Sequence, residues 1–260
     1  MTLDQRVPEP RTDDEIGQLA RTMNAMLDRL ESASERQKRF VSDASHELRS
    51  PVASIRLQLE TALMRPEQTD WEQVGRTVLA EDQRLAGLVD NLLALARIEE
   101  GQRRPQAEVD LDEIIHDQLA RPRRVTVDRS GVLAGRVYGV RDELTSVVRN
   151  LIDNAERHAG SVVKVSLATK GPWVRLAVED DGPGVEPNLR DKVFERFARL
   201  QEARSRDAGG AGLGLALTKR IVETHNGRIF IEDSSLGGAA FVVELPAAEL
   251  PADDEFEPVD

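Results

Sequence analysis

The chain has 260 residues and a formal net charge of −12, and charged residues make up 32% of it whereas aromatic residues make up only 3%. Leu, Val, Ala and Ile therefore have to build the core, and a nucleic-acid partner is disfavoured because phosphate contacts need clustered Lys and Arg. The absence of cysteine excludes disulfides and thiolate metal sites, and the lack of any apolar run near the roughly 20 residues of a membrane span predicts a cytoplasmic chain as given.

Residues 12 to about 100 have a helical pattern. In the first part, apolar residues recur in alternating steps of three and four, and Phe40 resumes the series after Gln37 interrupts it. This spacing is typical of a heptad seam and predicts a coiled coil that leads into a helical bundle. The residues of the first seam are Ile16, Leu19, Met23, Met26, Leu30 and Ala33.

A second apolar seam follows a short interruption at residues 65–68. Thr69 precedes Glu72 by three residues, which predicts a capping box at the start of the second helix. Two helices with a short connection form a hairpin that has too little apolar surface to be stable alone, so we expect two copies to pair as a four-helix bundle. The seam consists of Trp71, Val74, Val78, Leu85, Leu88, Leu92 and Leu95, with Glu81 between them.

After residues 101–105, which we interpret as a helix stop and linker, the pattern changes to mixed α/β. The periodicity predicts three helices, at residues 111–119, 142–157 and 213–224, and two strands, at residues 162–167 and 174–178. The two further segments at residues 228–232 and 240–245 are predicted to form a closing hairpin around Gly237 and Gly238.

Two glycine clusters and one pair of asparagines carry the chemistry of this second part. Gly182 and Gly184 follow a predicted strand, and residues 209–214 precede a predicted helix, where free N–H groups can bind phosphate. Asn150 and Asn154 lie four residues apart on one helical face. They indicate either a solvated polar face or oxygen ligands for a Mg²⁺ ion that bridges phosphates.

His46 is the candidate nucleophile. It lies on the first long helix, is followed directly by Glu47, and precedes Pro51 by five residues. A lone helical histidine is usually a polar surface residue, but its imidazole can also form a covalent adduct. The other three histidines, His116, His158 and His225, are scattered without zinc-ligand spacing.

Five segments, in order, resemble the sequence boxes of sensor histidine kinases. Residues 40–51, FVSDASHELRSP, resemble the phosphoacceptor box, and NLIDNAERHA at 150–159 resembles the asparagine box. VEDDGPGV at 178–185, FERFARL at 194–200 and GGAGLGLALTKRIVETHNGRI at 209–229 resemble the first glycine, phenylalanine and second glycine boxes. The resemblance implies an all-α hairpin that forms a dimeric four-helix bundle, followed by an α/β sandwich of the GHKL, or Bergerat, ATP-binding fold.

The segment at residues 14–17, followed by the heptad helix, resembles the second helix of a HAMP linker. The implied division is a partial HAMP linker and coiled coil at 1–33, a dimerisation and phosphotransfer domain at 34–101 and a linker at 102–105. A catalytic ATP-binding domain at 106–246 and an acidic, disordered tail at 247–260 complete it. We expect the chain to be a truncation, or an unusual relative, of a receptor in the inner membrane, connected to that membrane only through a missing N-terminal part.

The resemblance implies that His46 attacks the γ-phosphate of ATP and that Glu47 orients or deprotonates its imidazole. Ser50 stands where the family has Thr or Asn, which positions water for dephosphorylating the partner. The phosphoryl group would pass to a cognate response regulator, and Pro51 would supply a bend point for signalling. Loss of signal-dependent switching in Pro51→Ala would support that last hypothesis, and unchanged switching would contradict it.

The remaining site residues follow from the same resemblance, with ATP and Mg²⁺ as cofactors. Asn150 and Asn154 would contact phosphate oxygens and Mg²⁺, Asp180 would accept a hydrogen bond from the adenine amino group, and Gly182 and Gly184 would let adenine approach. Arg157 and His158 stand where the family has Lys and Tyr, and Ala198 replaces an aromatic residue. The residues assigned to the phosphates and their lid are Arg199, Gly210, Gly212, Leu213 and Gly214.

Two other functions share parts of this pattern. An ATP-driven conformational clamp of the same fold would need the asparagine and glycine boxes but not the box around His46. A degenerate dimer module would bind ATP without transferring a phosphoryl group. Loss of Asn154, Asp180 or the glycines would indicate such a module. All of these residues are present.

Overall fold

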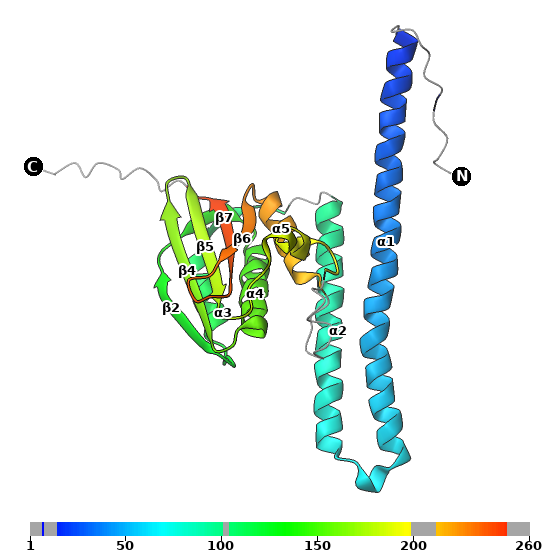
Figure 1. Ribbon diagram of the computed structural model, residues 1–260, viewed down its shortest axis with the longest axis vertical. Helices are drawn as coiled ribbons and strands as arrows, with labels where there is room; N and C mark the ends of the chain where they lie inside the picture. Colours follow the sequence, from blue (N-terminus) through cyan, green and yellow to red (C-terminus); the bar gives the residue numbers. More distant parts are fainter. Residues whose placement is uncertain (1–6, 8–14, 101–103, 199–211, 249–260) are drawn as a thin grey trace, which may run out of the picture. The chain divides into compact units, whose positions relative to one another are not determined.

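The computed structural model describes residue 7 and residues 15–100, 104–198 and 212–248 (Figure 1). The chain forms two compact units, residues 1–85 and residues 86–260. The predicted helix stop at Gly101, two candidate site residues, Arg199 and Gly210, and the tail from residue 249 onward lie outside the described residues.

The first unit is helical, as the heptad pattern predicts. Helix α1 spans Glu15–Met64, the short 3₁₀ helix η1 spans Pro66–Gln68, and helix α2 spans Trp71–Glu99, so that the boundary between the units falls within α2. Helix α1 continues through Pro51 without interruption. Because proline has no N–H group, the carbonyl of Glu47 lacks its usual donor four residues later.

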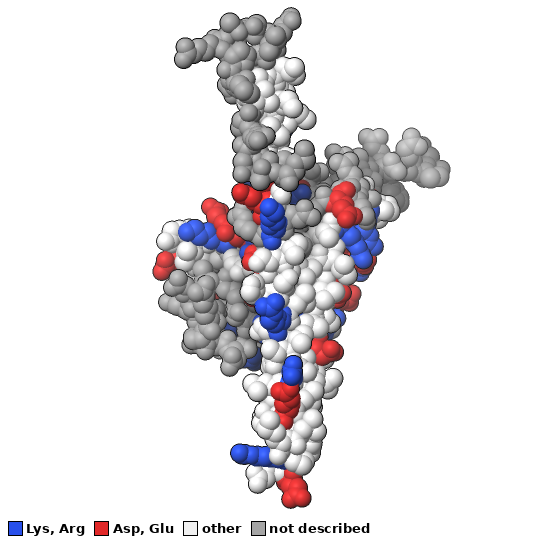
Figure 2. Space-filling view, turned by 90° about the vertical axis from the view of Figure 1, so that its right-hand side faces the viewer, with Lys and Arg blue, Asp and Glu red and all other residues white. Residues whose placement is uncertain are grey.

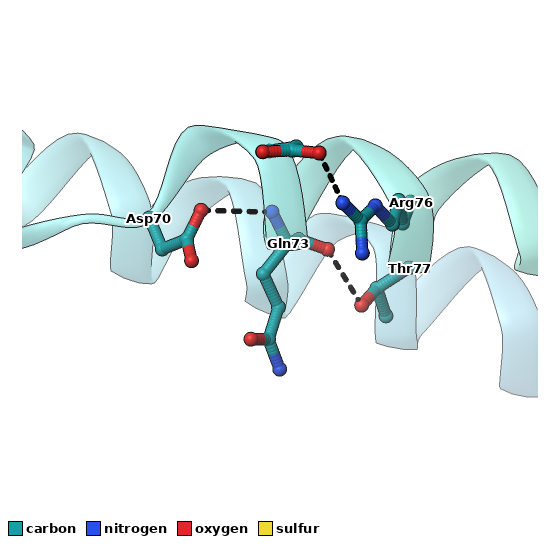
Figure 3. Close-up of a pocket in the computed structure, with 5 residues that line it drawn as sticks. Asp70, Gln73, Arg76 and Thr77 are labelled. Atoms are coloured by element: carbon teal, nitrogen blue, oxygen red, sulfur yellow. Dashed lines mark hydrogen bonds and ion pairs between the residues drawn. The ribbon is translucent and has the colours of Figure 1, made fainter.

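The start of α2 differs from the predicted capping box. Asp70, and not Thr69, caps the helix, because its carboxylate accepts a hydrogen bond of 3.0 Å from the backbone N–H of Gln73 (Figure 3). The Thr69 hydroxyl instead donates to the carbonyl of Arg65 at 2.7 Å. The first turns of α2 are further linked by a pair between Arg76 and Glu72 and by a bond from Thr77 to the carbonyl of Gln73.

Many large apolar side chains of the helical unit are exposed in the single chain. In the space-filling view, charged side chains near the end of the hairpin stand apart, with uncharged surface between them (Figure 2). Because so many large apolar side chains are exposed on these helices, their surface is a candidate for covering by another helix. The exposed residues include Leu19, Met23, Met26, Leu30, Val41, Val52, Leu57, Leu63, Met64 and Leu79. Within the described part of the chain, none of the helices combines the length and the apolarity that crossing a membrane requires.

The second unit is built on a five-stranded sheet of order β2-β4-β5-β7-β6. Strands β2 and β4 are parallel and the other neighbours are antiparallel. The strands are β2 (Thr126–Val132), β4 (Val162–Lys170), β5 (Trp173–Asp180), β7 (Ala239–Pro246) and β6 (Arg228–Asp233). A two-stranded sheet pairs β1 (Ala107–Asp110) with β3 (Arg136–Gly139). Two short 3₁₀ helices, η2 (Pro187–Leu189) and η3 (Lys192–Phe194), follow β5.

Three helices, α3 (Leu111–Leu119), α4 (Arg141–His158) and α5 (Gly214–Thr224), lie on one face of the large sheet (Figure 1). Alternation along β4 turns Val163, Val165 and Leu167 toward the helices, and all three are fully buried. Leu144 and Leu151, which share one face of α4, are also fully buried. This α/β sandwich is the fold class that the sequence predicts.

The opposite face of the sheet is polar and internally paired. Arg175 forms ion pairs with Glu232 at 2.6 Å and Glu244 at 3.1 Å, and Arg228 also pairs with Glu244. The guanidinium of Arg175 also lies over the Phe230 ring. Cross-strand pairs of this kind stabilise a sheet whose second face meets solvent.

The ordered chain extends two residues beyond the predicted end of the domain. The N–H groups of Ala247 and Ala248 donate to the carbonyls of Pro172 and Arg136, both at 2.9 Å. Ala248 is buried. These two residues, predicted to begin the disordered tail, therefore belong to the folded unit.

Candidate active site

Asp180 lies at the end of β5 and is only 2% exposed. Its Oδ1 accepts hydrogen bonds from the backbone N–H groups of Gly182 at 2.9 Å and Ala239 at 3.3 Å. Burial raises the pKa of the Asp180 carboxyl, while these two N–H donors act in the opposite direction. Within the described residues both of these bonds go to Oδ1, and Oδ2 accepts no hydrogen bond from the protein.

Two glycines make room around this carboxylate. A Cβ on Gly182 would lie 2.3 Å from the carbonyl oxygen of His158, and one on Gly238 would lie 2.4 Å from Oδ1 of Asp180. Gly184 has a φ of +74°, which disfavours other residues. Gly238 was missed as a site residue, because the Gly237-Gly238 pair indicates only a hairpin turn in the sequence.

Helix α4 carries the predicted polar residues. Asn150 and Asn154 are both half-buried, and Nδ2 of Asn150 donates to the carbonyl of Gly214 in α5 at 3.2 Å. Arg157 and His158 occupy the last turn of α4 with exposed side chains. Partial desolvation, followed by the charge of Arg157, lowers the pKa of His158, and Asp180 opposes this shift. The structure thus brings the asparagine box beside the glycines at Asp180 and at Gly214.

The second glycine box begins α5. Gly212 has a φ of +67°, and its carbonyl accepts a hydrogen bond of 2.9 Å from the N–H of Phe197 in the phenylalanine box. Leu213, between Gly212 and Gly214, is fully buried. A Cβ on Gly214 would lie 3.5 Å from Cγ of Asn150. The second glycine box therefore contacts the phenylalanine box at Gly212 and the asparagine box at Gly214.

The candidate phosphoacceptor residues lie in α1, in the other unit. The side chains of His46 and Ser50 are exposed and share one face of the helix, since they are four residues apart. Among the described residues, no hydrogen bond or ion pair joins Glu47 to His46. Adjacent residues on a helix point about 100° apart, so the geometry of this chain does not bring the two side chains together.

Comparisons with known proteins agree with this geometry. Residues 139–249 match the family of histidine kinase-, DNA gyrase B- and HSP90-like ATPases. Residues 36–101 match the phosphoacceptor domain of histidine kinases, and residues 2–32 match the HAMP domain. The probable sensor histidine kinase TcrY of Mycobacterium tuberculosis is 39% identical over 93% of this chain and 54% of its own length. The chain belongs to the two-component sensor histidine kinases.

Other relatives place this histidine kinase in the same family. BaeS of Escherichia coli, a signal transduction histidine-protein kinase, is 36% identical over 91% of this chain and 52% of its own length. MprB of Mycolicibacterium paratuberculosis, named a kinase/phosphatase, is 37% identical over 92% of this chain and 48% of its own length. The kinase described here thus spans about half the length of the curated relatives that it matches.

Solved structures support the fold. The histidine kinase AdeS of Acinetobacter baumannii matches with a TM-score of 0.60 and 24% identity, covering 77% of this chain and 97% of that chain. Full-length ShkA, in complex with AMPPNP, matches with a TM-score of 0.57 and 25% identity over 81% of this chain and 46% of its own. Both likenesses agree with a helical hairpin that precedes the α/β sandwich.

Two residues of this histidine kinase have structural roles that its sequence does not indicate. Asp181 accepts hydrogen bonds from the N–H groups of Gly160, Ser161 and Val162 at 2.8 to 3.1 Å, and from the Ser161 hydroxyl at 2.6 Å. These donors hold the pKa of Asp181 far below its usual range. The Asp181 carboxylate thereby fixes the turn between α4 and β4, next to His158.

The second such residue is Arg123, which lies between α3 and β2. Its side chain is largely buried and pairs with Asp153 at 2.7 Å and Glu156 at 3.0 Å on α4. Its guanidinium also donates to the carbonyl of Gln118 at 2.9 Å. Arg123 therefore anchors the helical turns that flank Asn154.

The asparagine box is the part of the site whose side chains could contribute to a metal site. The asparagine box supplies two amide side chains, whose oxygens are hard donors of the kind that Mg²⁺ takes. Within the described residues, no group of three or more His, Cys, Asp or Glu side chains forms a metal cage. The available donor set therefore fits an ion bound through one or two protein oxygens plus phosphate and water.

Proposed function

We propose that this chain binds Mg-ATP in its α/β unit, transfers the γ-phosphoryl group to His46, and then passes it to an aspartate of a response regulator. The buried carboxylate of Asp180, with one oxygen left for a ligand and glycines on either side, is the observation that carries the nucleotide assignment. The names of TcrY, BaeS and MprB as histidine kinases support the phosphoryl transfer. The AMPPNP complex of ShkA supports a nucleotide site.

In this proposal each box has one task. Oδ2 of Asp180 accepts a hydrogen bond from the adenine amino group, and Gly182 and Gly184 leave room for the ring. Asn150 and Asn154 face the phosphates with their amide oxygens, and the Arg157 charge lies beside them. Mg²⁺, when bound, would neutralise phosphate charge and align the phosphates for in-line attack. Gly212 and Gly214, with Arg199 and Gly210, which lie outside the described residues, belong to the phosphate end.

His46 is the proposed nucleophile. Its exposed position on α1 lets a nucleotide-bearing domain reach it, and the attacking nitrogen must be unprotonated because the imidazolium ion has no free lone pair. Glu47 needs a side-chain rearrangement to act on His46, since the two residues point apart along α1. Ser50, one turn later, is the proposed water-positioning residue for dephosphorylation, and the kinase/phosphatase MprB is a precedent for such an activity.

The exposed apolar side chains of α1 and α2 support a homodimer. Two hairpins would bury this surface in a four-helix bundle whose helices pack at coiled-coil angles. The phosphotransfer domain at 34–101 and the catalytic domain at 106–246 belong to the same proposal, and the matches at 36–101 and 139–249 support it. The HAMP match at 2–32 supports a membrane-bound full-length receptor.

The two alternative functions have less support. A GHKL-type clamp does not need a phosphoacceptor domain, whereas residues 36–101 match one. A degenerate module would have lost part of the nucleotide site, whereas Asn154, Asp180 and the glycines are all present. Active transfer is therefore the function that the site supports best.

Substitution of Asp180 tests the nucleotide assignment. Wild type and Asp180→Asn are incubated with Mg²⁺ and either γ-labelled or α-labelled ATP. We expect γ-label to be retained by the wild type only, because an amide at this position turns a donor toward the adenine amino group, and α-label to be retained by neither. Equal γ-labelling of both variants would show that Asp180 does not recognise the nucleotide.

A further inference from the structure

Thr218 is a fully buried polar residue in α5, one helical turn after Gly214. Its hydroxyl donates to the carbonyl of Gly214 at 2.8 Å. The same hydroxyl oxygen lies 3.4 Å from Nδ2 of Asn150, which donates to it. Asn150 Nδ2 also donates to the carbonyl of Gly214 at 3.2 Å. Thr218, Gly214 and Asn150 thus form a closed polar triangle between α4 and α5.

This triangle determines which end of the Asn150 amide faces α5. The Gly214 carbonyl can only accept, and the Thr218 proton is already donated to that carbonyl, so the hydroxyl presents a lone pair to Asn150. An Oδ1 in the same place would be repelled by the Gly214 carbonyl, and the hydroxyl could donate to it only by giving up its own bond to that carbonyl. The NH₂ end is therefore committed to α5, and the Oδ1 end points to the opposite side of the amide.

The direction of Oδ1 matters because only the oxygen can serve a cation. A Mg²⁺ ion takes oxygen ligands, and an amide turned by 180° would present two N–H donors to it. Asn150 is half-buried, so free rotation of its amide is restrained by packing but not stopped. The hydroxyl of Thr218 supplies the second of the two contacts that favour one rotamer.

From this geometry we infer that Thr218 is a positioning residue that orients the Asn150 amide so that Oδ1 faces the metal and phosphates. The inference rests on the proposed function, since it assumes that Asn150 lies at the Mg²⁺ end of the nucleotide site. Thr218 does not touch the ligand. Its effect reaches the nucleotide through Asn150, and because the Gly214 contact persists without the hydroxyl, its loss weakens the orientation without abolishing it.

The test compares Thr218→Val, which keeps the shape and removes the hydroxyl, with Thr218→Ser, which keeps the hydroxyl. Thr224→Val is the matched control, because Thr224 lies in the same helix and its hydroxyl contacts only groups at the end of α5, donating to the carbonyl of Ile221 at 2.7 Å and lying 3.5 Å from Nδ1 of His225. Binding of a fluorescent ATP analogue to the full chain is titrated against Mg²⁺ and repeated in EDTA. The unfolding temperature without nucleotide is recorded for each variant.

We expect Thr218→Val to need about two- to tenfold more Mg²⁺ for half-maximal enhancement of binding, the equivalent of one neutral hydrogen bond. Its affinity in EDTA should equal that of the wild type, and Thr218→Ser and Thr224→Val should behave as the wild type. An unchanged Mg²⁺ requirement in Thr218→Val would overturn the inference and leave the proposed function standing. Equal weakening with and without Mg²⁺, together with a lower unfolding temperature, would also overturn it, as a purely structural effect. A wild-type chain that binds no nucleotide would instead contradict the proposed function itself.

Discussion

The backbone N–H of Val140 donates a hydrogen bond of 3.1 Å to Nε2 of His225, although 85 residues separate them. Val140 is the cap residue of α4, and His225 follows the last turn of α5. The other ring nitrogen, Nδ1, faces the carbonyl of Ile221 at 2.8 Å and carries the proton. The bond from Val140 links the start of α4 to the end of α5, and the contact of Asn150 with Gly214 links the middle of α4 to the start of α5.

His225→Ala should destabilise the α/β unit by about 2 to 4 kcal/mol, because it leaves a cavity and a buried N–H without a partner. His225 is 4% exposed, whereas His116 is exposed on α3. His116→Ala therefore serves as the control and should change stability by less than about 0.5 kcal/mol. Urea unfolding followed by Trp173 fluorescence in a Trp71→Phe background reports on this unit alone. Equal effects of the two substitutions would contradict the assignment.

Asp181→Asn should reduce stability in a pH-dependent manner. The pKa of Asp181 is lowered in the folded state by the donors of residues 160–162. The Asp181 carboxylate contributes to the free energy of unfolding. This contribution is fully present above the ordinary aspartate pKa of about 3.9, and it is lost as the pH falls from there toward the pKa of Asp181 in the folded state. The stability difference between wild type and Asp181→Asn should therefore be constant near neutral pH and shrink below about pH 4. Asp117→Asn, at an exposed position on α3, is the control. A difference that grows on acidification would have the wrong sign for this account.

Arg123→Ala should cost about 2 kcal/mol of stability, since it leaves Glu156 partly buried without its cation. Burial acts against the charged form of Glu156, but the N–H of Arg124 and the Arg123 guanidinium keep the pKa of Glu156 below its usual value. Arg121→Ala removes the same side chain two residues away, at an exposed position, and should have little effect. Chemical denaturation of both variants makes the comparison, and a costly Arg121→Ala would argue against a specific role for Arg123.

Gly182→Ala should disrupt the nucleotide site. Its Cβ would lie 2.3 Å from the carbonyl of His158, so the turn beside Asp180 has to move. We expect at least about tenfold weaker ATP binding, the equivalent of one or two lost hydrogen bonds. Gly160→Ala is the control, because the nearest atom that its Cβ would meet is 3.6 Å away. Wild-type affinity in Gly182→Ala, measured by calorimetry, would show that the turn tolerates the change.

The regular helices and the central strands could be predicted because the spacing of apolar residues within each segment indicates its secondary structure. Helix α4 has the 3.6-residue period, and β4 alternates residue by residue. Strand β2 could not be predicted, since its sequence TVDRSGV is mostly exposed and lacks alternation, and its pairing with β4 is parallel across α4. The short strands β1 and β3 were not predicted either, because each is a strand through its antiparallel pairing with the other.

The residues of the site can likewise be separated into those that a local sequence pattern predicts and those that only the folded chain reveals. The glycine and asparagine boxes are local patterns, so they could be found in the sequence and were found near one another in the structure. Arg123 meets Asp153 over 30 residues of sequence, and Thr218 meets Asn150 over 68, so only the folded chain brings these partners together. The cap of α2 was predicted one residue too early, because the sequence pattern favours Thr69 whereas the neighbouring Asp70 caps the helix.

The most direct test of the central claim is the chemistry of the phosphorylated residue. Wild type and His46→Gln are incubated with Mg²⁺ and γ-labelled ATP, and the labelled protein is treated with acid or alkali. The account predicts label on the wild type only, lost in acid and stable in alkali, as expected for a phosphohistidine. Equal label on His46→Gln, or acid-stable label on the wild type, would contradict His46 as the phosphoacceptor.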